Sequence, residues 1–150
     1  MLNDDYKEML QLLSDAGVEF LVVGAFALAA HGYPRTTGDI DIFINPTPDN
    51  ARKVYAALQK FGAPLVDLDE TDLTKENLIY QIGVAPRRID ILTSISGVTF
   101  AEAAADQVRM AVDGQIIPLI SPRKLIQNKT AVGRPKDLED AAKLKNVLKS

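Results

Sequence analysis

Three aspartates lie where their carboxylates could act together on a bound cation. Asp39 and Asp41 are two positions apart in the segment DIDIFI, whose other residues are all apolar. Side chains two positions apart on a strand point to the same side, about 7 Å apart along the chain. Because neighbouring carboxylates repel and aspartate is a poor strand former, this pattern indicates that both acids hold a divalent cation, Mg²⁺ or Mn²⁺.

A third acid, Asp90, lies in the later segment RIDIL, where the isoleucines on either side point away from it. Three carboxylates on neighbouring strands would hold two metal ions, a triphosphate and an attacking hydroxyl, and Asp90 could also be the general base for that hydroxyl. One plainer interpretation places Asp39 and Asp41 on the wet face of an edge strand. Another pairs Asp90 with Arg87 or Arg88 in a salt bridge.

Three further places carry groups that suit phosphate oxygens. Gly24 and Ala25 lie between a buried-strand pattern and a helical one, and a helix start offers free N–H groups and a partial positive charge. Arg35 lies shortly before Asp39 and could contact a phosphate. Lys129 lies near the end of a predicted helix, where it either belongs to an ordinary solvated charge cluster or reaches the triphosphate as a point charge.

The elements that must position these residues follow from hydrophobic periodicity and capping signals. Helices are predicted over about 4–16, 24–31, 48–61, 99–106, 122–132 and after 135, and strands over 18–23, 39–45, 78–84, 88–93, 108–112 and 115–120. The acidic residues 65–77 predict a solvated, irregular loop. This order implies an α/β (α+β) fold with helices packed against a mixed β-sheet. Since no linker divides the chain, residues 1–150 are predicted to form a single domain.

Composition excludes several other classes of protein. The absence of cysteine and the single histidine exclude disulfides, thiolate zinc sites, cysteine nucleophiles and multi-histidine metal sites. The formal net charge of −3 argues against a nucleic-acid binder that uses its whole surface. The apolar run 20–30 is too short to span a membrane. We therefore expect a cytoplasmic protein with no membrane partner.

Taken in order, these residues resemble the signature of the nucleotidyltransferase superfamily, whose fold is that of the DNA polymerase β palm. The signature is an apolar residue and Gly-Gly or Gly-Ser, then Asp-x-Asp, and then a third acid on a later strand. Its counterparts here are Val23-Gly24-Ala25, Asp39-Ile40-Asp41 and Asp90. The resemblance covers nearly the whole chain.

Within that superfamily the chain is similar to small prokaryotic AbiEii-type and related proteins. Their Arg-x-Thr-x-Asp-x-Asp stretch is matched from Arg35 to Asp41. Their late basic and acidic segment is matched by Lys129, Arg134, Lys136, Asp137 and Asp140. Several of these relatives are toxins of toxin–antitoxin systems, and some transfer nucleotides to tRNA ends.

The resemblance implies a Mg²⁺-dependent enzyme that moves a nucleoside monophosphate from an NTP to a hydroxyl acceptor. Asp39 and Asp41 would bind the metal, Asp90 would complete the metal site or activate the acceptor, and Lys129 would contact the nucleotide phosphates. The implied acceptors are tRNA or protein, and the implied partner protein is an antitoxin.

One position departs from the superfamily pattern. The second glycine-turn residue is usually Gly or Ser, and here it is Ala25, which keeps its N–H but lacks a hydroxyl for a phosphate. This leaves open a second hypothesis, a catalytically weak or inactive module that binds a nucleotide or a partner. A third hypothesis, which we rank last, is a plain α/β domain with acids on its surface.

Overall fold

A mixed β-sheet organises the chain in the computed structural model, which describes residues 2–33 and 38–149. The strands of this part are β1 (Phe20–Val23), β2 (Asp39–Ile44), β3 (Ile79–Ile82), β4 (Arg88–Leu92), β5 (Val108–Val112) and β6 (Gln115–Leu119). They lie in the order β3-β4-β2-β1-β6-β5. β2 is parallel to β4 and β1 is parallel to β6, whereas the other neighbours are antiparallel.

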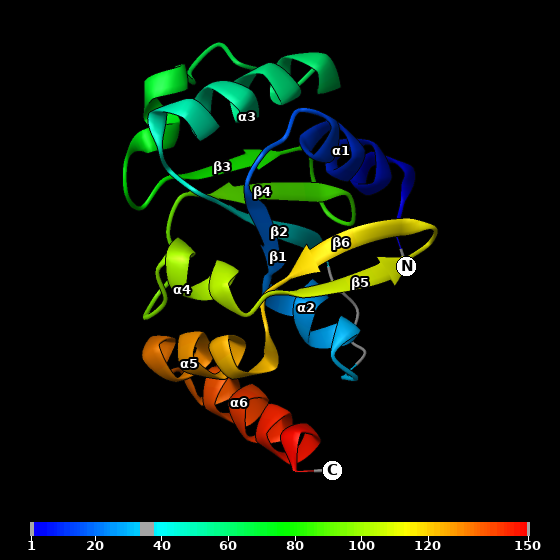
Figure 1. The fold of residues 1–150 in the computed structure, drawn as a ribbon, viewed down its shortest axis with the longest axis vertical. Coiled ribbons are helices and arrows are strands. Elements are labelled where there is room, and N and C mark those ends of the chain that lie inside the picture. The colour runs from blue at the N-terminus through cyan, green and yellow to red at the C-terminus, as the bar shows by residue number, and fades with distance from the viewer. Residues whose placement is uncertain (1, 34–37, 150) are drawn as a thin grey trace.

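Helices cover both sides of this sheet (Figure 1). They are α1 (Asp4–Asp15), α2 (Gly24–Ala30), α3 (Pro48–Phe61), α4 (Phe100–Ala105), α5 (Pro122–Val132) and α6 (Pro135–Leu148). In Figure 1, α1 and α3 lie above the sheet, while α4, α5 and α6 lie below it. The predicted α/β (α+β) class with a mixed sheet is confirmed. Along residues 2–33 and 38–149, no helix combines the length and the apolar character needed to cross a membrane.

The helix bounds follow the capping signals of the sequence. At the start of α3 the Thr47 side chain accepts a backbone N–H and Pro48 occupies the first turn, and Gly62 ends the helix in the left-handed conformation. α5 has Ser121 as its N-cap, Pro122 in its first turn and a left-handed Gly133 as its C-cap. Local chemistry therefore sets where these helices begin and end.

The prediction of an irregular loop over residues 65–77 is wrong in part, because a short 3₁₀-helix, η1 (Glu70–Thr74), lies within it. Asp69 and Asp72 form a reciprocal capping box at its start. Leu73 is fully buried, and η1 packs on α3. Five residues with a single buried side chain are too few to show a hydrophobic period, so this helix could not be predicted from the sequence.

The two sides of β2 have different neighbours. Ile40 and Ile42 are fully buried in the core. On the other side, Phe43 packs edge-to-face on Phe100 of α4, with ring centroids 5.2 Å apart. Side chains two positions apart share a side of a strand, so Asp39 and Asp41 lie on the α4 side of the sheet. The isoleucines therefore face α1 and α3.

Candidate active site

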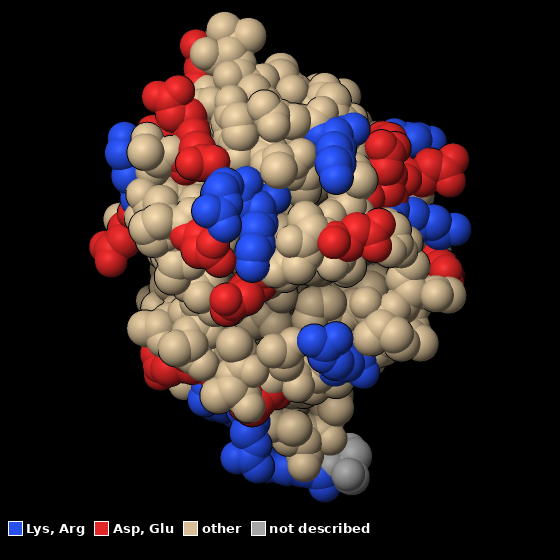
Figure 2. Space-filling view, turned by 45° about the horizontal axis from the view of Figure 1, so that its top comes forward, with Lys and Arg blue, Asp and Glu red and all other residues tan. Residues whose placement is uncertain are grey.

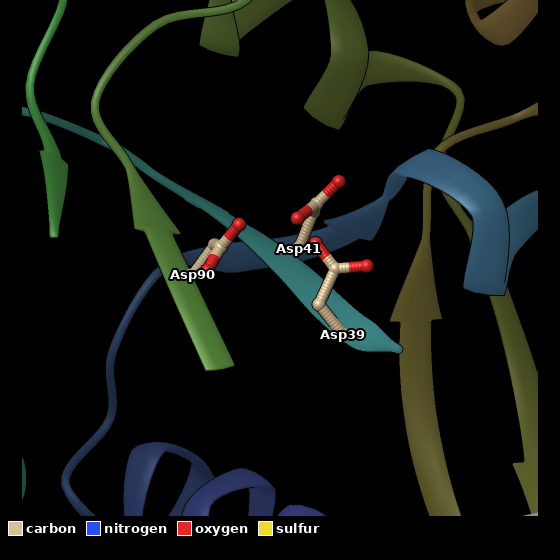
Figure 3. A group of neighbouring side chains, drawn as sticks. All are labelled: Asp39, Asp41 and Asp90. Carbon is tan, nitrogen blue, oxygen red and sulfur yellow. The ribbon is translucent and has the colours of Figure 1, made fainter. Parts of the chain in front are cut away.

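The pairing of β2 with β4 brings the three predicted acids together. Asp41 lies directly opposite Asp90 in this parallel pair. One carboxylate oxygen from each of Asp39, Asp41 and Asp90 lies within 4.8 Å of the other two. Figure 3 shows the three side chains converging above β2 and β4. β2 lies between β1 and β4, so it is not an edge strand and the wet-edge interpretation of its acids fails.

The electrostatics of the three acids are unfavourable without a cation. Burial, followed by the charges of Asp39 and Asp90, raises the pKa of Asp41 from 3.8 to about 7. Asp90 is only 5% exposed, and burial raises its pKa as well, against the opposing effect of Arg88. Three carboxylates this close, one buried and two partly buried, suit a divalent metal ion, which takes carboxylate oxygens as ligands and offsets their repulsion.

Arg88 is part of the same cluster. It lies two residues before Asp90 and directly opposite Asp39, so the three side chains share one side of the sheet. Its guanidinium donates to Asp39 at 2.7 Å and to Asp90 at 3.0 and 3.3 Å. The sequence predicted Arg88 only as one of two candidates for a salt bridge to Asp90. Its bond to Asp39 depends on strand register, which the sequence does not give. The one signal that could have placed Arg88 in the cluster is its spacing of two residues from Asp90, which puts both side chains on the same side of the strand.

Gly24 makes room for Asp41. Its backbone is in the left-handed region with φ +69°, and a Cβ placed on it would lie 2.3 Å from Asp41 Oδ2. Gly24 therefore serves the close approach of a carboxylate as well as the tight turn into α2. Ala25 follows it in the first turn of α2, where backbone N–H groups have no partner within the helix.

Gly24→Ala is expected to lose metal binding and activity, because the new methyl group occupies the space of the Asp41 carboxylate. Gly17→Ala is the matched control, since Gly17 has φ +71° and open space where its Cβ would lie. Both variants should lose about 1–2 kcal/mol of stability from the left-handed backbone. Calorimetric titration with Mn²⁺ should show weaker binding for Gly24→Ala alone. Equal binding by both variants would contradict the steric role of Gly24.

Lys129 lies where α5 meets α6. Its Nζ is 3.2 Å from Asp140 Oδ2 and 3.6 Å from Asp137 Oδ1, and all three side chains are largely buried. Arg134 also bonds Asp137 and holds the pKa of that carboxyl below its usual range. The ammonium thus has partners within the chain, and its contact with nucleotide phosphates stays a prediction. Arg35 lies outside the described residues.

A protein-family profile matches residues 2–150 of this chain. The family is DUF2204, described as nucleotidyl transferases of unknown function. The chain belongs to this family. The predicted membership of the nucleotidyltransferase superfamily is thereby confirmed, and so is the prediction of an enzyme. A search of curated proteins with the sequence of this nucleotidyl transferase found no match.

The fold of this nucleotidyl transferase is similar to that of solved structures. A Thermotoga maritima protein described as a nucleotidyltransferase is 16% identical with a TM-score of 0.64, over 97% of this chain and 96% of that one. ANT(2'')-Ia in complex with adenylyl-2''-tobramycin is 14% identical with a TM-score of 0.60, over 96% of this chain and 87% of that one. A solution structure of the antibiotic-resistance factor ANT(2'')-Ia is 13% identical with the same TM-score, over 97% and 83%. At these identities the likeness shows the fold.

Proposed function

We propose that residues 1–150 form one nucleotidyltransferase domain that uses Mg²⁺ or Mn²⁺ to move a nucleoside monophosphate from an NTP to a hydroxyl acceptor. The observation that carries this proposal is the convergence of Asp39, Asp41 and Asp90 within 4.8 Å on one side of the sheet. Family membership supports nucleotidyl transfer as the reaction. The acids supply the metal ligands that such a reaction needs.

Each residue of the cluster has a role in this proposal. Asp39 and Asp41 hold the metal, and Asp90 completes its ligand set or accepts the proton of the attacking hydroxyl. The bound metal neutralises charge on the phosphate oxygens and orients them. Gly24 and Ala25 present backbone N–H groups of the strand-to-helix turn to the phosphates of the NTP. The chain forms no covalent bond to the nucleotide, and apart from the proton that Asp90 can accept, its contribution is placement and charge.

A groove on the same side of the sheet is a suitable place for the acceptor. It has a volume of about 660 Å³, and Phe43, Ile79 and Ser94 are among its lining residues. Phe43 lies two positions after Asp41 on β2, so the groove begins one side-chain row from the acids. In-line transfer requires the hydroxyl to attack opposite the leaving pyrophosphate. Phosphates at Gly24 therefore place the acceptor on the β4 side of the cluster, where this groove lies.

The charges of the groove favour an acceptor without phosphates. Within the described residues, the charged side chains that line it are Glu76 and Glu102. On the face shown in Figure 2, Lys and Arg gather along the lower edge and elsewhere lie scattered among Asp and Glu. Of the acceptors that the sequence implied, a protein hydroxyl suits this groove better than tRNA. A hydroxylated small molecule suits it too, as the adenylyl-2''-tobramycin bound to ANT(2'')-Ia illustrates for that protein.

The test is nucleotide transfer in the presence of Mg²⁺. The protein is incubated with each α-³²P-labelled NTP and separately with total RNA, total protein, hydroxylated small molecules and tobramycin. Wild type is expected to label a protein or small-molecule acceptor, and Asp39→Ala is expected to label none. Equal labelling by both proteins would overturn the proposal. NTP binding without transfer to any acceptor would favour the alternative of a binding module, for which the missing hydroxyl at Ala25 is the sequence argument. A toxin role is tested separately, by growth arrest on expression.

A further inference from the structure

Arg88 already places a positive charge among the three acids. Its Nη2 donates to Asp39 Oδ2, its Nε to Asp90 Oδ1, and the same Nη2 also to Asp90 Oδ2. One guanidinium thereby joins two acids that come from different strands. Among the described residues, Arg88 bonds Asp39 and Asp90 but not Asp41.

These bonds use the oxygens that a metal ion would need. Both oxygens of Asp90 and one of Asp39 accept from the guanidinium. Mg²⁺ takes its ligand oxygens at about 2.0–2.1 Å in a nearly ideal octahedron. A guanidinium within hydrogen-bond distance of the same oxygens would repel that ion through a few ångströms of partly buried space. The two cations therefore compete for Asp39 and Asp90.

The Arg88 side chain is also partly open to solvent. Its side chain is 36% exposed, whereas that of Asp90 is 8% exposed. The guanidinium can thus leave toward solvent without a change in the backbone of β4, while the acids stay in place.

We propose that Arg88 is a positioning residue that occupies the place of the cation in the metal-free protein, and that metal binding exchanges it for the metal ion. Before the exchange, the guanidinium holds the carboxylates of Asp39 and Asp90 close together. During the exchange, it gives up its bonds to these carboxylates and turns toward solvent. This inference rests on the proposed function only in taking a divalent metal as the cofactor of the three acids.

The preceding residue, Arg87, offers a matched control for Arg88. Arg87 precedes β4 and pairs with Asp5 at 3.5 Å, and both side chains are well exposed. Arg87→Gln and Arg88→Gln change the net charge of the protein equally. If the two variants differ in their affinity for a metal ion, the difference is therefore due to where the removed charge lies and not to the net charge of the protein.

The experiment is a calorimetric titration of the metal-free full chain with Mn²⁺ at pH 8. Arg88→Gln is expected to bind Mn²⁺ about tenfold more tightly than wild type, because a repelling charge is removed. Arg88→Lys is expected to gain about threefold, since one ammonium cannot bridge both acids. Arg87→Gln should stay within about twofold of wild type. Arg88→Gln should also melt at a lower temperature than wild type without metal and gain more from saturating Mn²⁺. If Arg88 had a purely structural role, Arg88→Gln would lower the melting temperature by the same amount without metal and with saturating Mn²⁺.

A second measurement uses the wild-type protein and keeps the proposal testable if the variants do not fold. The side-chain Nε–H signal of Arg88 is followed by ¹⁵N NMR during titration with Mg²⁺. Exchange predicts that this signal loses the shift of a carboxylate-bound N–H as the metal saturates, while that of Arg87 does not. An unchanged Arg88 signal at saturation, or Mn²⁺ affinity that is unchanged or weaker in folded Arg88→Gln, would overturn the inference. Exchange without any nucleotide transfer would leave it standing and would count against the proposed function alone.

Discussion

Asp41→Asn is expected to abolish nucleotidyl transfer and, at the same time, to raise the melting temperature of the metal-free protein at pH 8. Removal of a metal ligand forfeits several kcal/mol of transition-state stabilisation, so activity should fall about 10³-fold or more. The same change removes an ionised carboxylate from beside Asp39 and Asp90, where its charge is unfavourable. Activity and stability should therefore move in opposite directions.

The raised pKa of Asp41 explains why Asp41→Asn should stabilise the protein at pH 8, and it predicts how the stability of the wild type changes with pH. The pKa of Asp41 is raised from 3.8 to about 7, so in the pH range between these values the folded protein holds the proton more tightly than the unfolded chain. The stability of the metal-free wild type should therefore fall as pH rises from about 4 to about 7 and stay level above that. Thermal melts from pH 5 to pH 8 should show a fall of about 5 °C or more for wild type and a flatter profile for Asp41→Asn.

The control for Asp41→Asn is Glu8→Gln, which makes the same charge change at an exposed position of α1. Glu8→Gln should keep wild-type activity and a wild-type pH profile of stability. A melting temperature of Asp41→Asn at or below that of wild type at pH 8 would show that Asp41 is not strained by its neighbours. Retention of transfer activity by Asp41→Asn would remove it from the metal site.

Lys129→Met is expected to destabilise the protein by about 3–5 kcal/mol, because it removes an ammonium that lies between two buried carboxylates. Asp137 and Asp140 are 2% and 1% exposed, and the Lys129 side chain that contacts them is 13% exposed. Arg134 remains as a partner of Asp137 in this variant. Urea unfolding followed by circular dichroism measures the effect.

Lys143→Met is the matched control for this ion pair. Lys143 pairs with Glu139 on the exposed face of α6, and such pairs contribute about 1 kcal/mol or less. Adding Asp140→Asn to Lys129→Met should recover part of the lost stability. If Lys129→Met instead kept wild-type stability and raised only the KM for NTP, Lys129 would belong to the nucleotide site, as the resemblance implied.

Strand periodicity accounts for how much of the site could be predicted. Alternation in DIDIFI and RIDIL predicted that Asp39, Asp41 and Asp90 point to the side of the sheet away from the isoleucines of their strands. The structure has them on that side. The same alternation says nothing about which residue of one strand faces which residue of the other. The bond between Arg88 and Asp39 depends on that register, so it could not be predicted from either segment alone.

Contacts between helices were beyond the sequence pattern for a similar reason. The spacing of Asp137 and Asp140 predicts one shared helix face, and the structure has both buried. What covers that face is decided by how α5 packs on α6, and this brings Lys129 between the two acids. Periodicity gives the direction of a side chain within its own helix, whereas its partner is a property of the packed pair.

The parallel pairing of β2 with β4 also governs when the acids can meet during folding. Asp39 and Arg88 are 49 residues apart in the sequence, and α3 and β3 lie between their strands. Contacts between distant residues form only after a long loop has closed, and parallel pairs are slow for this reason. The three acids can therefore meet only after this loop has closed. A metal ion held by all three acids, as proposed, would not template the sheet, because its ligands meet only when β2 and β4 pair. It would instead stabilise the paired strands and so slow unfolding.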